Sequence, residues 1–237
     1  DTAPAVVVAQ AALLLGNEGQ SVAEEVLAAA ERALLKGPMA AQIGVFALEK
    51  AANVLGTNDV WDRVMRACAK LPETDAVRIL RYRARARRLP WERVGPELDR
   101  LVETTTLPDP PFWRAGRRIK IGDFTGARAD FAEARRRGGR EVDVVAAEAE
   151  LYRHEGDIER AASCIKPHEV QAANLPIAWW KLGIFNGLLQ RDDDSRAAFG
   201  EALRLRPEML AEAVRDLRED TTDPDWARIV SDVRMAI

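Results

Sequence analysis

The side chains best suited to catalysis or metal binding are few in this sequence. Among 237 residues there are two histidines and two cysteines. Cys164 and His168 are four residues apart and Glu169 is adjacent, so the three could share a helix face and hold a metal weakly. Pro167 interrupts that segment and a fourth ligand is missing, so a packing thiol beside a surface histidine is the preferred interpretation. We expect no metal site here.

Motifs for cofactor or nucleophile chemistry are missing from the sequence as well. It has no glycine-rich phosphate loop, no nucleophile elbow, no His-Glu-x-x-His helix and no paired-cysteine metal motif. His154 stands at the predicted end of a helix, where a cation complements the helix dipole. Carboxylates are abundant, but nothing selects an acid–base pair among them. We therefore expect a protein with no cofactor and no catalytic residue.

Arginines in the middle of the chain are the most distinctive charged residues. Residues 74–140 carry 17 basic and 9 acidic side chains, whereas the net charge of the whole chain is −3. Four arginines at spacings of three, four and three fall on one face of a predicted helix. The next predicted first helix of a pair, beginning at Phe112, carries three more. If these helices stack in register, the guanidinium groups form one positive surface. We call it the arginine strip, and it consists of Arg78, Arg81, Arg85, Arg88, Arg114, Arg117 and Arg118.

The arginine strip has more than one interpretation. A guanidinium group binds a carboxylate or a phosphate through two parallel hydrogen bonds, so the strip could hold an acidic peptide or protein. The strip could instead bind the phosphates of a nucleic acid or a lipid, which we favour less. The net negative charge of the chain disfavours nucleic acid as the partner. The alternative is a solvated polar face whose arginine stems cover apolar surface.

Helices must position these residues. Apolar residues recur at three- and four-residue spacing through most of the chain, and breaks containing proline or glycine separate the periodic segments. Aromatic residues make up only 6% of the chain, and no run of 18 uncharged apolar residues exists. The sequence therefore predicts about fourteen helices in seven pairs, at about 34 residues a pair.

Three landmarks recur with a period of 34 residues. A small residue recurs as Ala127, Ala161 and Ser195, and a bulky one as Phe131, Ile165 and Phe199. The turn Gly122-Asp123 recurs as Gly156-Asp157, with Gln190-Arg191 in the third place. A glycine in such a turn can take the left-handed conformation that ends one helix, and an aspartate can cap the next. The landmarks predict helix pairs that stack in a constant register.

This pattern resembles the tetratricopeptide repeat. Residues 178–183 (Ala-Trp-Trp-Lys-Leu-Gly) resemble the family's first-helix motif, and Ser195, Phe199, Ala202 and Pro207 follow at the family's positions. The preceding repeat resembles it through Ala149, Tyr152, Gly156, Ala161 and Ile165, but its second helix is expected to end early at Pro167. The repeat before that resembles it through Trp113, Gly122, Asp123, Phe124, Ala127, Phe131 and Ala134.

The resemblance implies an all-α, right-handed superhelical solenoid of about seven antiparallel helix pairs with a concave groove. We expect one array over residues 1–237. Its parts would be degenerate repeats over 1–107, recognisable repeats over 108–207, and capping helices within 208–237, at 209–217 and 226–236.

The function that the resemblance implies is non-catalytic binding of a protein or peptide in the groove. Outward residues of the first helices line that groove in the family, which makes the arginine strip and Trp180 the candidate partner-binding residues, while Trp179 is assigned to packing. Two alternatives stay open. The chain could recruit substrate for a larger enzyme, such as a glycosyltransferase or hydroxylase, or it could be an RNA-binding helical repeat. The compartment, cytoplasmic or periplasmic, and the oligomeric state are open too.

Overall fold

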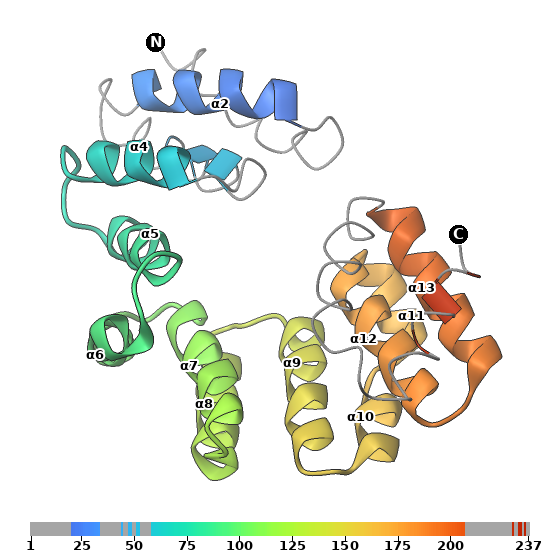
Figure 1. Ribbon diagram of the computed structural model, residues 1–237. Helices are drawn as coiled ribbons and strands as arrows, with labels where there is room; N and C mark the ends of the chain where they lie inside the picture. Colours follow the sequence, from blue (N-terminus) through green and yellow to red (C-terminus); the bar gives the residue numbers. More distant parts are fainter. Residues whose placement is uncertain are drawn as a thin grey trace. The chain divides into compact units, whose positions relative to one another are not determined.

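The computed structural model describes residues 20–33, 44, 47–48, 51–52, 58–206, 229, 232–233 and 235. All regular elements in this part of the chain are α-helices, which confirms the predicted all-α repeat fold. None of the helices described there is long and apolar enough to cross a membrane. The chain divides into two compact units, Asp1–Thr106 and Leu107–Ile237, and Figure 1 shows the helices of each. The single array over 1–237 stays a prediction.

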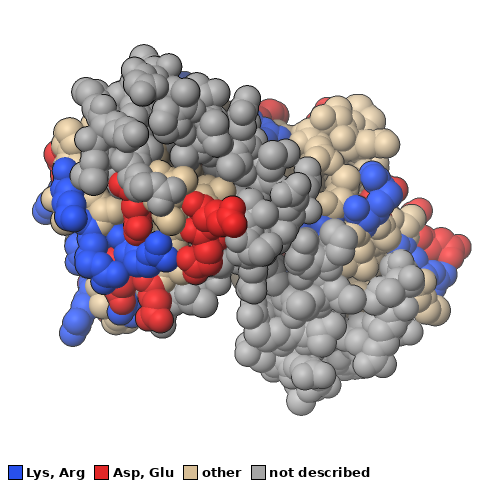
Figure 2. Space-filling model, turned by 90° about the horizontal axis from the view of Figure 1, so that it is seen from above, with Lys and Arg blue, Asp and Glu red and all other residues tan. Residues whose placement is uncertain are grey.

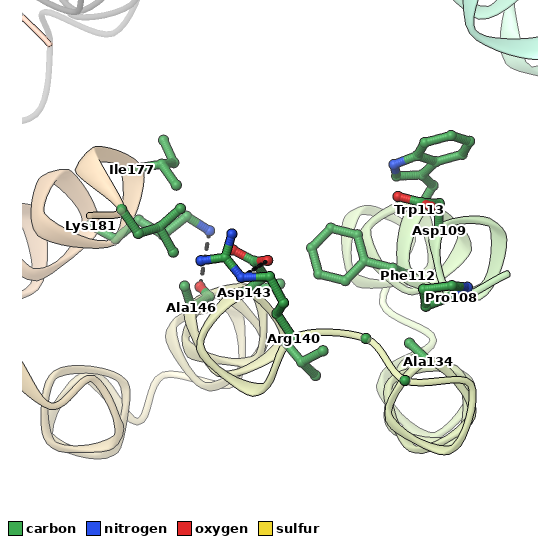
Figure 3. A pocket seen from close by; sticks show the side chains of 15 residues that line it. Pro108, Asp109, Phe112, Trp113, Ala134, Arg140, Asp143, Ala146, Ile177 and Lys181 are labelled. Carbon is green, nitrogen blue, oxygen red and sulfur yellow. Dashed lines mark hydrogen bonds and ion pairs between the residues drawn. The ribbon is translucent and has the colours of Figure 1, made fainter. Parts of the chain in front are cut away.

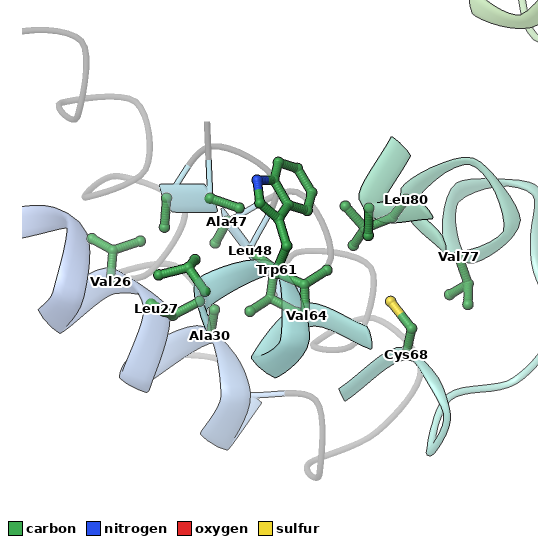
Figure 4. Packing of buried hydrophobic residues seen from close by; sticks show 14 residues of the cluster. Val26, Leu27, Ala30, Ala47, Leu48, Trp61, Val64, Cys68, Val77 and Leu80 are labelled. Atoms are coloured by element: carbon green, nitrogen blue, oxygen red, sulfur yellow. The ribbon is translucent and has the colours of Figure 1, made fainter. Parts of the chain in front are cut away.

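Three of the described helices in the first unit, α2 (Gln20–Ala33), α4 (Asn58–Cys68) and α5 (Asp75–Ala86), pack around a buried tryptophan. A further described helix of this unit is α6 (Trp91–Thr104). Trp61, Val64 and Cys68 lie on one face of α4 because they follow each other by three and four residues, and all three are fully buried. Figure 4 shows the Trp61 ring between side chains of α2 and Leu80 of α5. This cluster is the core of the unit.

The described part of the second unit contains three helix pairs. Its helices are α7 (Asp109–Lys120), α8 (Phe124–Arg136), α9 (Glu141–His154), α10 (Ile158–Cys164), α11 (Pro167–Ala173), α12 (Pro176–Leu188) and α13 (Asp192–Leu205). The helix α7 packs on α8, α9 on α10, and α12 on α13. The helix α9 also contacts both α7 and α12. The first helices of the three pairs are therefore neighbours, and α11 is an additional short helix between the second and third pairs.

The turns within the three pairs repeat at the predicted spacing. Gly122 and Gly156 have φ angles of 78° and 86°, in the left-handed region that favours glycine. Asp123 and Asp157 each cap the following helix, their carboxylates accepting from the backbone N–H of Gly126 (2.9 Å) and Arg160 (3.0 Å). In the third pair Gln190 takes the same left-handed conformation, at φ 61°, and no side chain caps α13.

The 34-residue landmarks form the contacts between paired helices. Ala127, Ala161 and Ser195 are fully buried, and the Ser195 hydroxyl donates to the carbonyl of Gly183 at 2.9 Å. Phe131 and Phe199 are fully buried as well. A Cβ atom at Gly183 would lie 2.7 Å from the Phe199 ring, so only glycine lets α12 and α13 approach this closely.

The predicted capping helices at 209–217 and 226–236 lie outside the described residues, except for four positions of the second. Among those four, Ile229 and Val233 are buried with Phe199 in one cluster, and Asp232 pairs with Arg196 at 3.3 Å.

Candidate functional site

The four arginines of the strip in the first unit contact carboxylates of their own chain. Arg78 pairs with Asp75 and donates to the Thr104 hydroxyl at 2.8 Å. The other three reach across to separate partners: Arg81 to Glu73 at 2.7 Å, Arg85 to Glu97 at 3.0 Å, and Arg88 to Asp62. The pairs of Arg81 and Arg85 join α5 to the segment before it and to α6, and Arg88 joins the turn after α5 to α4. All four side chains are partly exposed.

The strip residues of the second unit surround a buried aspartate. The Arg114 guanidinium holds both carboxylate oxygens of Asp130, at 2.7 and 2.9 Å, and Arg118 reaches the same carboxylate at 3.1 Å. The Asp130 side chain is only 4% exposed. Arg118 also donates to the carbonyl of Gly126 at 2.9 Å. Arg117 is half-buried and has interactions of its own. The pairing through Asp130 ties α7 to α8.

These contacts favour a role for many strip arginines in the protein's own packing. A guanidinium that already binds a carboxylate through two of its three nitrogens has fewer N–H groups left for a partner's carboxylate. Figure 2 shows acidic side chains beside the basic ones on the face it presents. The strip divides between the two units, Arg78 to Arg88 in one and Arg114 to Arg118 in the other, so the strip as one surface stays a prediction.

Trp180 is half-buried rather than fully exposed. Its ring lies 4.7 Å from that of Phe199, centroid to centroid, and it packs against the cluster that contains Ile229. Trp179 is 9% exposed and belongs to the core of the second unit, as the family register implies. The assignment of Trp180 to partner binding stays a prediction.

The segment with Cys164, His168 and Glu169 has the features of ordinary packing. The Cys164 thiol donates to the carbonyl of Ala161 at 3.3 Å, and burial raises its pKa to about 11. His168 is 79% exposed and lies 3.9 Å from Glu169. In the part of the chain that the structure describes, no three metal-ligating side chains come together.

A cavity of about 600 Å³ in the second unit is lined mainly by α7, α9 and α12, the first helices of the three pairs. Figure 3 shows Phe112 and Trp113 extending from α7 on one side and Ile177 from the start of α12 on the other. Small residues form the floor between them, including Ala134, Gly138, Gly139 and Ala147. Because these residues have little or no side chain, the space between the apolar walls is left open. We call this cavity the α7–α9–α12 pocket.

The charged groups of the α7–α9–α12 pocket are paired with one another or with close neighbours. Arg140 pairs with Asp143 at 3.4 Å. The Lys181 ammonium donates to the carbonyl of Ala146 at 3.1 Å and lies 3.5 Å from Glu150, and Asp109 has interactions of its own. Burial lowers the pKa of Lys181, although Glu150 offsets part of that effect. The pocket therefore offers apolar surface with a few oriented polar groups.

Sequence reasoning missed this pocket. Its apolar residues are spread over four helices and the turn between α8 and α9, and only stacking brings them together. Two signals point to it in retrospect: the neighbouring aromatics Phe112 and Trp113, and the Gly138-Gly139 pair before α9. Ile177 is the clearest single member, because it is 44% exposed although it is large and apolar.

Comparison with known proteins supports the fold. No family model matches the sequence, and no curated protein matches it. Among solved structures, the chain is similar to a tetratricopeptide-repeat chain in the crystal structure of the APC/C hetero-tetramer Cut9–Hcn1. The TM-score is 0.61 at 10% sequence identity, over 89% of this chain and 46% of that one. The chain thus spans about half the length of that chain, and the likeness shows an all-α helical repeat fold.

Proposed function

We propose that this chain is a non-catalytic protein-interaction scaffold that binds a partner protein in the α7–α9–α12 pocket. The carrying observation is an open apolar cavity along three neighbouring first helices, with an exposed isoleucine on its wall. Concave apolar sites with a few oriented polar groups are typical of ligand and partner binding. Burial of a large apolar side chain there would contribute about 1.5–3 kcal/mol to binding.

The electrostatics of the pocket support binding rather than acid–base chemistry. A general acid or base must be free to exchange a proton with a bound substrate. Asp143 and Lys181 instead hold Arg140 and Glu150, respectively. Burial tends to raise the pKa of Glu150, but Lys181 and Arg153 more than offset this, and its pKa lies below its ordinary value. Glu150 therefore stays ionised near neutral pH and is no proton donor.

The proposal is tested with two matched isoleucine variants. Ile177→Asp places a charge on the pocket wall, whereas Ile121→Asp places one in the turn after α7 at a side chain that is 62% exposed and does not line the pocket. Tagged wild-type and variant proteins capture partners from lysate of the source organism, followed by quantitative mass spectrometry. We expect at least one protein to be recovered by wild type and Ile121→Asp and lost with Ile177→Asp. Equal recovery of every captured protein by both variants would count against the pocket.

The arginine strip is a second, electrostatic contribution to the proposed function. The Arg85–Glu97 pair allows a charge swap, Arg85→Glu with Glu97→Arg, that retains the ion pair and the net charge. If the strip holds an acidic segment, the swap should lower recovery of the same partner and make it less sensitive to salt. Unchanged recovery and salt dependence would assign Arg85 to packing alone.

A further inference from the structure

The second helix of the middle pair is half as long as its counterparts. The helix α10 has 7 residues, whereas α8 has 13 and α13 has 14. Ala134, His168 and Ala202 share one position of the 34-residue register. Ala134 of α8 and Ala202 of α13 are fully buried, whereas His168, at this position in the middle pair, is exposed. Pro167 lacks a backbone N–H and cannot continue α10, so the chain turns away at Lys166 and begins α11. About two turns of helix are therefore missing from the position that α8 and α13 fill in their own pairs.

The missing turns leave a second cavity, of about 500 Å³. One wall is a row on α12 at spacings of three and four: Trp179, Leu182 and Asn186. The other is a row on α13 with similar spacing, including Asp194, Ala197 and Glu201. Two such rows on neighbouring helices form the kind of groove into which a third helix packs. We call this space the α10-end cavity.

A buried polar group in the wall of the α10-end cavity lacks a partner. Trp179 is about nine-tenths buried, and its indole N–H donates no hydrogen bond. Buried donors are almost always satisfied in folded proteins, and this one has no acceptor within the described part of the chain. Asn186, on the same face, is also buried and polar.

The rim of the α10-end cavity is acidic on the α13 side. Asp194 makes no ion pair with any residue in the described part of the chain, and Glu201 pairs with Arg204 of its own helix. The two nearby cations are turned to other carboxylates, Arg191 to Glu159 at 2.7 Å and Lys166 to Glu169 at 3.1 Å. A basic residue of a bound segment would meet Asp194 without competition from these cations.

We propose that the α10-end cavity binds an amphipathic α-helix of a partner protein, which takes the place of the missing half of α10. Small residues such as alanine would face Trp179 and Leu182. They would take the register position that Ala134 and Ala202 occupy in the other two pairs. A basic residue would face Asp194. This site is separate from the α7–α9–α12 pocket and does not depend on its function.

The experiment uses a helical segment of the chain itself as the probe. A fluorescein-labelled peptide repeats residues 132–137 twice in succession, because this part of α8 ends in three arginines and is the part that has no helical counterpart after Ile165. A lactam bridge holds the peptide helical, since an isolated helix of this length is marginal in water. A peptide of the same composition in scrambled order serves as the control probe.

Fluorescence polarisation then compares wild type with two tryptophan variants of α13. Ala197 lines the cavity and is exposed, so Ala197→Trp fills the cavity without entering the core. Asp193 is 98% exposed and does not line it, which makes Asp193→Trp the matched control. We expect saturable binding of the probe to wild type and to Asp193→Trp, and a loss of about tenfold or more with Ala197→Trp. In ¹⁵N NMR spectra the Trp179 indole resonance should shift on binding.

Three results would overturn the proposal. One is the absence of saturable binding up to about 1 mM probe. Another is a lack of specificity, in which the probe binds wild type and Ala197→Trp equally, or wild type binds the probe and the scrambled peptide equally. The third is a dimer of the chain alone, detected by sedimentation and lost with Ala197→Trp, which would assign the cavity to a second copy instead.

Discussion

At the scale of single residues, many charged side chains in the described part of the chain form ion pairs within the protein. The spacing of Arg114 and Arg118 correctly indicates one helix face, but it does not indicate that Asp130 of the next helix lies beneath them. A partner of this kind comes from another element and follows from packing alone. The aromatic assignments depend less on distant partners: the family register places Trp179 in the core, and it is there.

Asp130 is expected to be the most sensitive charged residue of the second unit. Asp130→Ala removes the acceptor of two arginines and leaves their charges partly buried, which should lower the free energy of unfolding by about 3 kcal/mol. Glu159→Ala breaks the exposed pair with Arg191 and should cost no more than about 1 kcal/mol. Urea denaturation followed by circular dichroism measures both. Equal losses for the two variants would show that the buried pairing does not stabilise the unit.

At the scale of elements, the 34-residue period predicts the helix pairs well because it reflects contacts between adjacent segments. The turns at Gly122 and Gly156, with the caps at Asp123 and Asp157, are confirmed at the predicted positions. The early end of α10 before Pro167 is confirmed as well. The helix α11 and the two cavities were not predicted, because they depend on where the chain goes after the break and on which side chains are small.

Two glycines in the last pair should respond in opposite ways to alanine. Gly183→Ala forces the new methyl group against the Phe199 ring and should destabilise the protein by about 1–3 kcal/mol. Gly200 lies within α13, and a Cβ atom there would meet nothing within 4 Å. Gly200→Ala should therefore stabilise the helix by up to about 1 kcal/mol. Thermal unfolding of both variants tests this, and a loss of stability with Gly200→Ala would contradict the packing described for α13.

At the scale of the whole molecule, the described part of the chain has an all-α repeat fold, and charge is unevenly distributed along the sequence. The chain carries a net charge of −3, although its middle segment, residues 74–140, is basic. This basic segment contributes residues to both units. All-α repeats bury their faces against neighbours, and the open faces that remain are available to partners. The fold class followed from the sequence because helix period and repeat period are local. The pocket did not, because it consists of residues from four helices that only the packing of the helix pairs brings together.

The most direct test of the proposed function is site-specific photo-crosslinking in cells of the source organism. A benzoylphenylalanine residue is introduced at position 177, on the wall of the α7–α9–α12 pocket, or at position 121, which is exposed outside it. If the pocket holds a partner protein, irradiation should give a discrete crosslinked species from position 177 that position 121 does not give. The same adducts from both positions, or adducts from position 121 alone, would contradict binding in the pocket.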